Sequence, residues 1–255
     1  MEIRKIRSEN LPYTALLYCP PGVGKSTAIG LIAERSEGNT LVLDVDRTIE
    51  RTLAKGEIVK DTEKIFVVPV ENRGADKAAG IEGTFASWAN LLKKEITPEF
   101  LKENNIKTVA VDNISELERC ILSDLGAQGK NKGVPAMADY QYMQFQLVNS
   151  LRTMKGWGVN IVWTAWEDVR SIVHPDGTSY SQMVPKISPK IVDNVCGLCD
   201  VVGKIIVVQR NGEPQHGIIL EATQSIYAKN QIDSRKGCRV EDFVNFVNHE
   251  KEVES

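Results

Sequence analysis

The segment from Cys19 to Thr27 constrains the fold of this chain more than any other feature. It reads Cys-Pro-Pro-Gly-Val-Gly-Lys-Ser-Thr, and it lies between an apolar run at residues 14–18 and a helix-like run at residues 28–33. Glycines at these positions let the backbone curl until successive N–H groups converge on an anion at the start of a helix. This order predicts a phosphate-binding loop in an α/β fold. The alternative is a chance glycine-rich turn, which the intact Gly-Lys-Ser-Thr disfavours.

The residues of this loop are the candidate nucleotide-binding residues. Lys25 would reach the β- and γ-phosphates of a nucleoside triphosphate, and the Ser26 hydroxyl would bind Mg²⁺. Cys19 stands where the usual pattern has glycine, but this position closes the strand and touches no phosphate. We therefore expect ATP and Mg²⁺ as ligands, although the loop does not distinguish ATP from GTP. The candidate residues are Pro21, Gly22, Val23, Gly24, Lys25, Ser26 and Thr27.

The composition is that of a soluble globular protein, and it limits the partners. Of the 255 residues, 42% are hydrophobic and 25% are charged, with a net charge of −3. No overall positive field therefore attracts nucleic acid or a membrane, so any such binding must be local. No apolar run approaches the about 18 residues of a membrane span, and residues 1–7 do not resemble a signal peptide. Five cysteines, an odd number, favour reduced thiols. We expect a cytoplasmic protein without membrane association.

Strand-like and helix-like segments alternate along the first two thirds of the chain. This alternation predicts a mainly parallel central sheet flanked by helices. The expected strands are residues 40–46, 64–70, 107–112 and 159–164, and the expected helices are residues 87–94, 115–125 and 138–154.

The pattern changes toward the C-terminus, where two antiparallel hairpins are expected. The first spans residues 170–183 around a Pro-Asp-Gly turn, and the second spans residues 201–221 around Asn-Gly. A short amphipathic helix closes the chain at about residues 240–249. We expect one domain over residues 1–255, with its core at about residues 12–230. Cys196 and Cys199 have zinc-knuckle spacing, but no second pair of ligands follows, so we interpret them as buried residues on a helix.

Asp112 is the candidate acid for the metal ion. It follows the apolar run Thr108-Val-Ala-Val, which is typical of a buried strand. A carboxylate at the carboxyl end of a parallel strand, beside the phosphate-binding loop, can organise the ligands of Mg²⁺.

The order of these motifs resembles the core of the RecA/RadA recombinases, in particular the short RecA-like nucleotide-binding proteins of phages. The resemblance rests on the phosphate-binding loop, Leu-Asp-Val-Asp, Val-Ala-Val-Asp-Asn and Ile-Val-Trp-Thr-Ala-Trp-Glu, from about residue 16 to residue 229. It implies a RecA-like P-loop ATPase that binds single-stranded DNA in recombination or strand annealing. For a phage protein, the compartment would be the cytoplasm of the bacterial host.

The resemblance also implies roles at the ends of two strands. Asp46 corresponds to the carboxylate that polarises the attacking water, although it is one methylene shorter than the usual glutamate. Glu50 and Glu71 are alternatives, and Asp46 is otherwise a polar residue that ends a strand. Trp166 stands where the family has a glutamine or histidine that senses the γ-phosphate. Because an indole cannot accept a hydrogen bond, Thr164 or Glu167 are alternatives for this role.

Two loops of the family that face DNA correspond to residues 126–136 and 168–190. Basic side chains with an aromatic ring between them suit a single strand, because the charges follow phosphates and the ring stacks on a base. The alternative is a solvated loop with ordinary lysines. The candidate DNA-binding residues are Lys130, Lys132, Arg170, Tyr180, Lys186 and Lys190.

Lys229 corresponds to a lysine that reaches the γ-phosphate of the neighbouring subunit in RecA-like filaments. The resemblance therefore implies a homo-oligomer in which Lys229 acts in trans, with Arg235 or Lys236 as alternatives. A surface lysine after a strand is the simpler interpretation. A single-strand-binding protein is a further expected partner.

Two other functions compete with the recombinase-like ATPase. The first is a nucleotide-switched binding module that hydrolyses little ATP and arranges a protein or DNA-replication partner; the short Asp46 and Trp166 favour it. The second is a small-molecule kinase. Such kinases usually close a lid of arginines over the phosphates, and the region after residue 164 offers only Arg170 before its hairpin.

Overall fold

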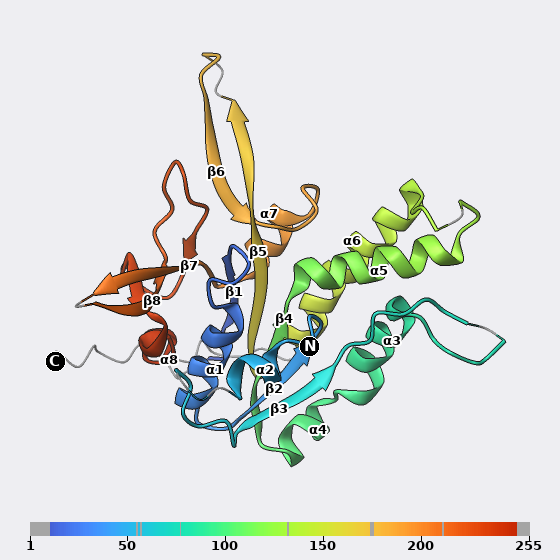
Figure 1. The fold of residues 1–255 in the computed structure, drawn as a ribbon, viewed down its shortest axis with the longest axis horizontal. Coiled ribbons are helices and arrows are strands. Elements are labelled where there is room, and N and C mark those ends of the chain that lie inside the picture. The colour runs from blue at the N-terminus through green and yellow to red at the C-terminus, as the bar shows by residue number, and fades with distance from the viewer. Residues whose placement is uncertain are drawn as a thin grey trace, which may run out of the picture.

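A mainly parallel sheet of ten strands forms the centre of the computed structural model (Figure 1), which describes residues 11–248 except 55, 57, 77, 132, 174, 175 and 211. The strands are β1 (Thr14–Cys19), β2 (Asn39–Asp44), β3 (Ile65–Pro69), β4 (Ile106–Asp112), β5 (Asn160–Val173), β6 (Ser179–Pro185), β7 (Val201–Arg210), β8 (Glu213–Ile219), β9 (Lys229–Asn230) and β10 (Gly237–Arg239). Their order is β10-β8-β7-β1-β5-β4-β2-β3, with β6 beside β5 and β9 beside β7. The pairs from β7 through β1, β5, β4 and β2 to β3 are parallel.

Helices cover both faces of this sheet. They are α1 (Lys25–Arg35), α2 (Ile49–Leu53), α3 (Thr84–Asn90), α4 (Pro98–Glu103), α5 (Ile114–Gln128), α6 (Met137–Lys155), α7 (Val192–Leu198) and α8 (Phe243–Val247). A π-helical turn, Leu91–Glu95, extends α3, and a 3-10 turn, Val240–Asp242, precedes α8. None of the helices in the described ranges is both long and apolar enough to cross a membrane.

The alternation of side chains along β1 shows how the two layers are formed. Leu16 and Tyr18 pack into the core beneath α3 to α7, whereas Leu17 and Cys19 pack into the core beneath α1, α2 and α8. Successive side chains of a strand point to opposite faces, so a strand covered on both sides is apolar throughout. The continuous apolar runs in the sequence are therefore the central strands.

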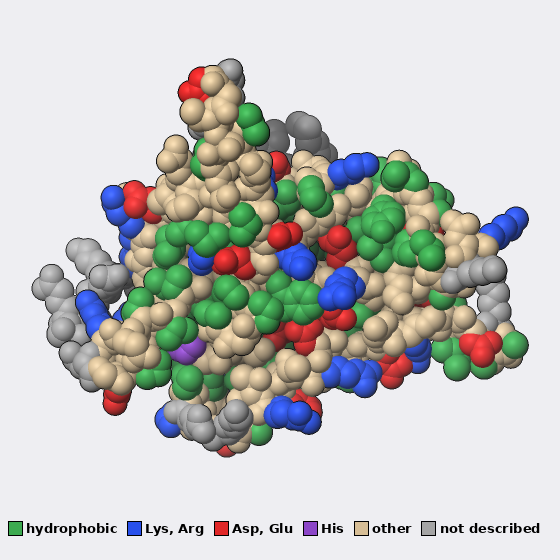
Figure 2. Space-filling model, turned by 45° about the horizontal axis from the view of Figure 1, so that its top comes forward, with side chains coloured by type: hydrophobic (Ala, Val, Ile, Leu, Met, Phe, Trp, Pro, Cys, Tyr) green, Lys and Arg blue, Asp and Glu red, His purple; other side chains and the backbone are tan. Residues whose placement is uncertain are grey.

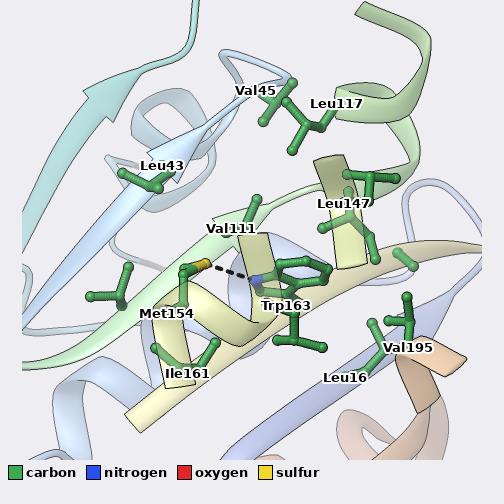
Figure 3. Packing of buried hydrophobic residues seen from close by; sticks show 14 of the residues in the cluster. Leu16, Leu43, Val45, Val111, Leu117, Leu147, Met154, Ile161, Trp163 and Val195 are labelled. Atoms are coloured by element: carbon green, nitrogen blue, oxygen red, sulfur yellow. Dashed lines mark hydrogen bonds between the residues drawn. The ribbon is translucent and has the colours of Figure 1, made fainter. Parts of the chain in front are cut away.

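Trp163 lies at the middle of the larger core. Its ring is fully buried among Leu16, Val111 and Leu147, and its indole N–H points at the sulfur of Met154 over 3.3 Å (Figure 3). A side chain of this size connects β5 to the strands on either side and to α6, so it fixes the helical layer on the sheet.

The predicted fold class is confirmed, with differences at the edges. Both C-terminal hairpins are present, as β5–β6 and β7–β8. β5 extends nine residues beyond the predicted end at residue 164 because residues 167–173 pair with β6. α2 and α4 were not predicted, since helices of five and six residues are too short for a periodic pattern.

The hairpin of β5 and β6 projects from the body of the molecule (Figure 1). Hydrophobic side chains lie on this projection in Figure 2; Val169 and Val173 are 58% and 68% exposed. Residues 160–166 of the same strand belong to the central sheet. One strand therefore runs from the core into the projection.

We predict that Trp163→Ala lowers the free energy of unfolding by about 3–5 kcal/mol, because it removes a buried ring and leaves a cavity. Urea denaturation followed by circular dichroism measures this loss. Phe145→Ala is the matched control, since Phe145 is an aromatic residue that is 70% exposed on α6. Its loss should stay within about 0.5 kcal/mol. Equal losses in the two variants would contradict this account of the core.

Candidate functional site

The loop between β1 and α1 has the geometry of an anion-binding turn. Gly22 and Gly24 have φ angles of 80° and 118°, in the left-handed region that favours glycine. Gly24 caps α1, and its carbonyl accepts a hydrogen bond from the N–H of Ala28 over 2.8 Å. A Cβ atom on Gly24 would lie 2.7 Å from Cε1 of His216, which comes from β8. The backbone angle therefore favours glycine at position 24, and any larger residue would also displace the imidazole of His216.

This loop forms one wall of a cavity of about 370 Å³. Lys25 reaches into the cavity from the start of α1, and Asp46 and Trp166 form part of its other walls. Val23 is not among the lining residues; its side chain packs against the core on the α1 face. The lining residues are Pro21, Gly22, Gly24, Lys25, Ser26, Thr27, Asp46, Thr48, Thr52 and Trp166. Six of the seven predicted loop residues thus line one cavity with the predicted base.

The two predicted metal ligands lie in contact with each other. The Ser26 hydroxyl donates a hydrogen bond to Oδ2 of Asp112 over 2.5 Å, and Thr164 donates one to Oδ1 over 2.7 Å. Asp112 is 1% exposed at the end of β4, between the loop and β5. Both oxygens of this carboxylate are therefore fixed in orientation by hydroxyl groups.

The donor set around Asp112 fits Mg²⁺. Hydroxyl and carboxylate oxygens are the ligands that this hard cation takes in nucleotide sites, usually together with water. Asp44 and Asp46 lie nearby, and Oδ1 of each is buried without a hydrogen-bond partner among the described residues. Buried carboxylate oxygens without partners are costly unless a cation or water satisfies them. Ser26 and Asp112 would hold the ion, and it would neutralise charge on the phosphates.

Asn113 holds Asp46 in place, a role that the sequence interpretation missed. Its side-chain N–H donates to Oδ2 of Asp46 over 2.6 Å, while its Oδ1 accepts from the backbone N–H of Glu116 over 2.9 Å and caps α5. An amide is suited to this position because it can donate and accept at the same time. The signal in the sequence was Asn113 followed three residues later by Glu116, a helix-start pattern.

The surroundings of Asp46 raise the pKa of its carboxyl group to about 6. Burial is the main cause, and the negative charges of Asp112, Glu116 and Asp44 act in the same direction, while Lys25 opposes them. A general base works best when its pKa lies close to the working pH. The alternatives Glu50 and Glu71 do not line the cavity, and Glu71 instead pairs with arginines.

Trp166 stands in the cavity wall next to the start of the loop. It pairs with Cys19 in the parallel register of β1 and β5, and its backbone N–H donates to the Ser115 hydroxyl over 2.9 Å. Of the two alternatives for the sensor, Thr164 binds Asp112, and Glu167 forms an ion pair with Lys204 at 2.9 Å. The indole is thus the side chain at this position that faces the cavity.

Lys229 is engaged within its own chain. Its ammonium group donates to the carbonyl oxygens of Cys196, Gly197 and Cys199 at 3.4, 2.9 and 2.6 Å. These carbonyls end α7, where a cation is favoured by the helix dipole. Binding of Lys229 to the γ-phosphate of a neighbouring subunit stays a prediction. It would require the ammonium group to leave these three carbonyl oxygens.

The candidate DNA-binding residues do not form one surface. Lys186 and Lys190 follow β6, and both are exposed. Lys130 lies beyond the far end of α5, about 20 Å along the helix from its start. Arg170 is bound to Asp193 and Gln182 and lies over the ring of Tyr227, and Tyr180 is half-buried on β6. Lys132 is outside the described residues.

A family model described as an AAA domain matches residues 11–232. No curated protein matched the chain. Among solved structures, a KaiC-like protein from the hyperthermophilic archaeon Pyrococcus horikoshii OT3 has a TM-score of 0.45 and 15% identity, over 86% of this chain and 88% of that chain.

We expect Asp46→Asn to stabilise the metal-free protein at pH 8 and to have little effect at pH 4.5. The raised pKa means that folding favours the protonated carboxyl group. The cost of ionisation is absent below the unfolded pKa of about 4, and it is complete above the folded pKa of about 6. Because Asp46 is partly exposed, we expect about 1 kcal/mol, or about 2–4 °C in Tm.

Thermal unfolding in EDTA at the two pH values measures this difference. Asp168→Asn, at an exposed position on the hairpin, is the control. If Asp46→Asn destabilises the protein equally at both pH values, Asp46 is a structural residue in the segment that follows β2 rather than a carboxylate held at a cost for function.

Proposed function

Because this chain belongs to the AAA domain family, we propose that it binds ATP with Mg²⁺ at the loop from Pro21 to Thr27 and hydrolyses it. The observation that carries this proposal is the contact of Ser26 with Asp112 in the cavity region that also holds Lys25 and Asp46. The order and spacing of these groups match the needs of phosphoryl transfer, in which positioning and charge neutralisation do most of the work.

Each group has a distinct task in the proposed reaction. The backbone N–H groups of the loop and the ammonium of Lys25 would bind the β- and γ-phosphates. Asp46 would orient the attacking water and accept its proton, with Asn113 holding the carboxylate in position. Mg²⁺, bound through Ser26 and Asp112, would neutralise charge that develops on the phosphates.

We further propose that the protein acts on single-stranded DNA, in recombination or strand annealing. The support is the resemblance of the motifs and the position of Lys186 and Lys190, which lie on the segment that follows the projecting hairpin. A short basic segment gives local attraction to phosphates although the chain as a whole has a charge of −3. Homo-oligomerisation with Lys229 in trans belongs to the same proposal.

The decisive variant is Lys25→Ala, tested by steady-state hydrolysis of ATP with and without single-stranded DNA. Loss of a charge-assisted contact to phosphate should reduce ATP affinity about 10- to 100-fold and bring hydrolysis to background. For the wild-type protein we expect stimulation by DNA that weakens between 50 and 200 mM salt, because phosphate contacts release counterions. Lys107→Ala, at an exposed position on β4, is the control.

The outcomes separate the parts of the proposal. Normal turnover by Lys25→Ala would reject the nucleotide site itself. ATP hydrolysis that depends on Lys25 but does not change when single-stranded DNA is added would reject only the role in recombination. The double variant Lys186→Ala with Lys190→Ala tests whether the segment that follows β6 binds DNA. Unchanged affinity for DNA would exclude this segment.

A second candidate function is a nucleotide-switched binding module with little hydrolysis. Two features of Asp46 favour little hydrolysis. Its side chain is one methylene shorter than that of glutamate, and one of its oxygens already accepts a hydrogen bond from the amide of Asn113. Tight binding of ATP with a turnover that Asp46→Asn does not lower would establish this alternative. The search would then turn to a protein partner.

A further inference from the structure

Two cationic side chains lie on the ring of Trp166, next to the cavity. The guanidinium carbon of Arg119 is 5.7 Å from the ring centroid, and the ammonium nitrogen of Lys186 is 5.9 Å from it. Both distances are within the range of a cation–π interaction. The two residues come from different elements, since Arg119 lies on α5 and Lys186 follows β6. The indole therefore gathers two cations at one wall of the cavity.

Ser115 fixes the backbone at this wall. Its hydroxyl accepts the backbone N–H of Trp166 over 2.9 Å and donates to the carbonyl oxygen of Lys186 over 2.8 Å. The N–H of Lys186 in turn donates to the carbonyl oxygen of Trp166 over 2.8 Å. Because Ser115 lies on the first turn of α5, these bonds connect the wall to the end of the strand that carries Asp112.

Acidic side chains outnumber basic ones at the cavity and close to it. Asp46 lines the cavity, and the carboxylates of Asp112, Glu116 and Asp44 lie close enough to act on its charge, whereas Lys25 is the one cation among the lining residues of the described chain. A bound triphosphate adds further negative charge at its terminal phosphate. Acidic and basic side chains lie next to one another in the middle of the face in Figure 2, below the hairpin. A second source of positive charge at the far wall would balance the phosphate.

Arg119 and Lys186 are available for such a role. Arg119 is 68% exposed, and its ion pair with Glu116 is long, at 3.8 Å, so little free energy opposes its release. Lys186 is exposed and forms no ion pair with any residue that the structure describes. A guanidinium presents several N–H groups in a planar fork, which matches the oxygens of a phosphate.

We infer that Arg119 and Lys186, held on Trp166, bind the terminal phosphate of the nucleotide within the same chain and make the site select a triphosphate over a diphosphate. This inference rests on the proposed function and adds the basis of its specificity. Trp166 is a positioning residue, because it acts by holding the two cations at the wall. The same two cations could instead meet the phosphates of DNA, which the test below separates.

The test is isothermal titration of the full chain with MgATP and, separately, with MgADP. In the double variant Arg119→Ala with Lys186→Ala, we expect the affinity for ATP to fall about 10- to 100-fold, while the affinity for ADP changes less than about twofold. Trp166→Leu should reduce the ATP preference in the same direction, and Trp166→Phe, which keeps a ring, should retain most of it. Arg152→Ala, on the exposed face of α6, should change neither affinity.

Several outcomes would overturn the inference. An equal fall for ATP and ADP would show that the two cations act on the fold of the site rather than on the terminal phosphate. Unchanged nucleotide affinities with weaker binding of a single-stranded oligonucleotide would assign the cations to DNA. Arg119 is exposed, so its substitution should leave the thermal unfolding curve unchanged and keep the test valid if Trp166→Leu does not fold.

The failure of this inference is distinct from the failure of the proposed function. If Lys25→Ala abolishes ATP binding while the double variant keeps the ATP preference, the site is real and the assignment of the two cations is wrong. If wild-type protein and Lys25→Ala bind ATP equally, both proposals are rejected.

Discussion

The Ser26 hydroxyl donates a hydrogen bond to Asp112 over 2.5 Å, which joins the start of α1 to the end of β4. β1, which leads into the loop, and β4, which ends in Asp112, are not neighbours, because β5 lies between them. Thr164 of β5 spans this gap by donating to the other oxygen of Asp112. Since parallel strands end at the same edge of a sheet, three elements far apart in sequence meet at one carboxylate. The positions of the loop, Asp46 and Trp166 follow from this arrangement.

The same arrangement has a cost in stability. Asp44, Asp46 and Asp112 lie close together, and burial raises the pKa of both Asp44 and Asp46. A sheet end built only for stability would avoid this cluster or pair each acid with a base. Clusters of like charge that lower stability are expected at functional sites, where the rest of the fold compensates for their cost. Here the compensation comes from two apolar cores, one on each face of the sheet.

The sequence was sufficient for the features that depend on local pattern. The strand and helix on either side of residues 20–24 and the strand that ends at Asp112 are each encoded within a few consecutive residues, so these elements were predicted correctly. The contacts of Asn113 with Asp46 and of Arg119 with Trp166 were missed because they depend on which side chains the fold brings together. Arg170 reads as a free basic residue in the sequence, but Asp193, 23 residues later, holds it through a tertiary contact. The sequence pattern predicts elements and motifs, whereas the partners of a charged side chain can be identified only in the folded structure.

β5 belongs both to the central sheet and to the projecting hairpin. Residue 166 pairs with β1, and residue 167 pairs with β6, so the change of partner occurs at the cavity wall. Glu167 is fixed there by Lys204 in an ion pair whose side chains are 14% and 12% exposed. Removing one member of a buried ion pair leaves the other charge buried without a partner, so a substitution at this junction would lower the stability of the fold. No loop separates the hairpin from the cavity. Trp166 at the cavity wall and the exposed residues of the hairpin therefore belong to one continuous strand.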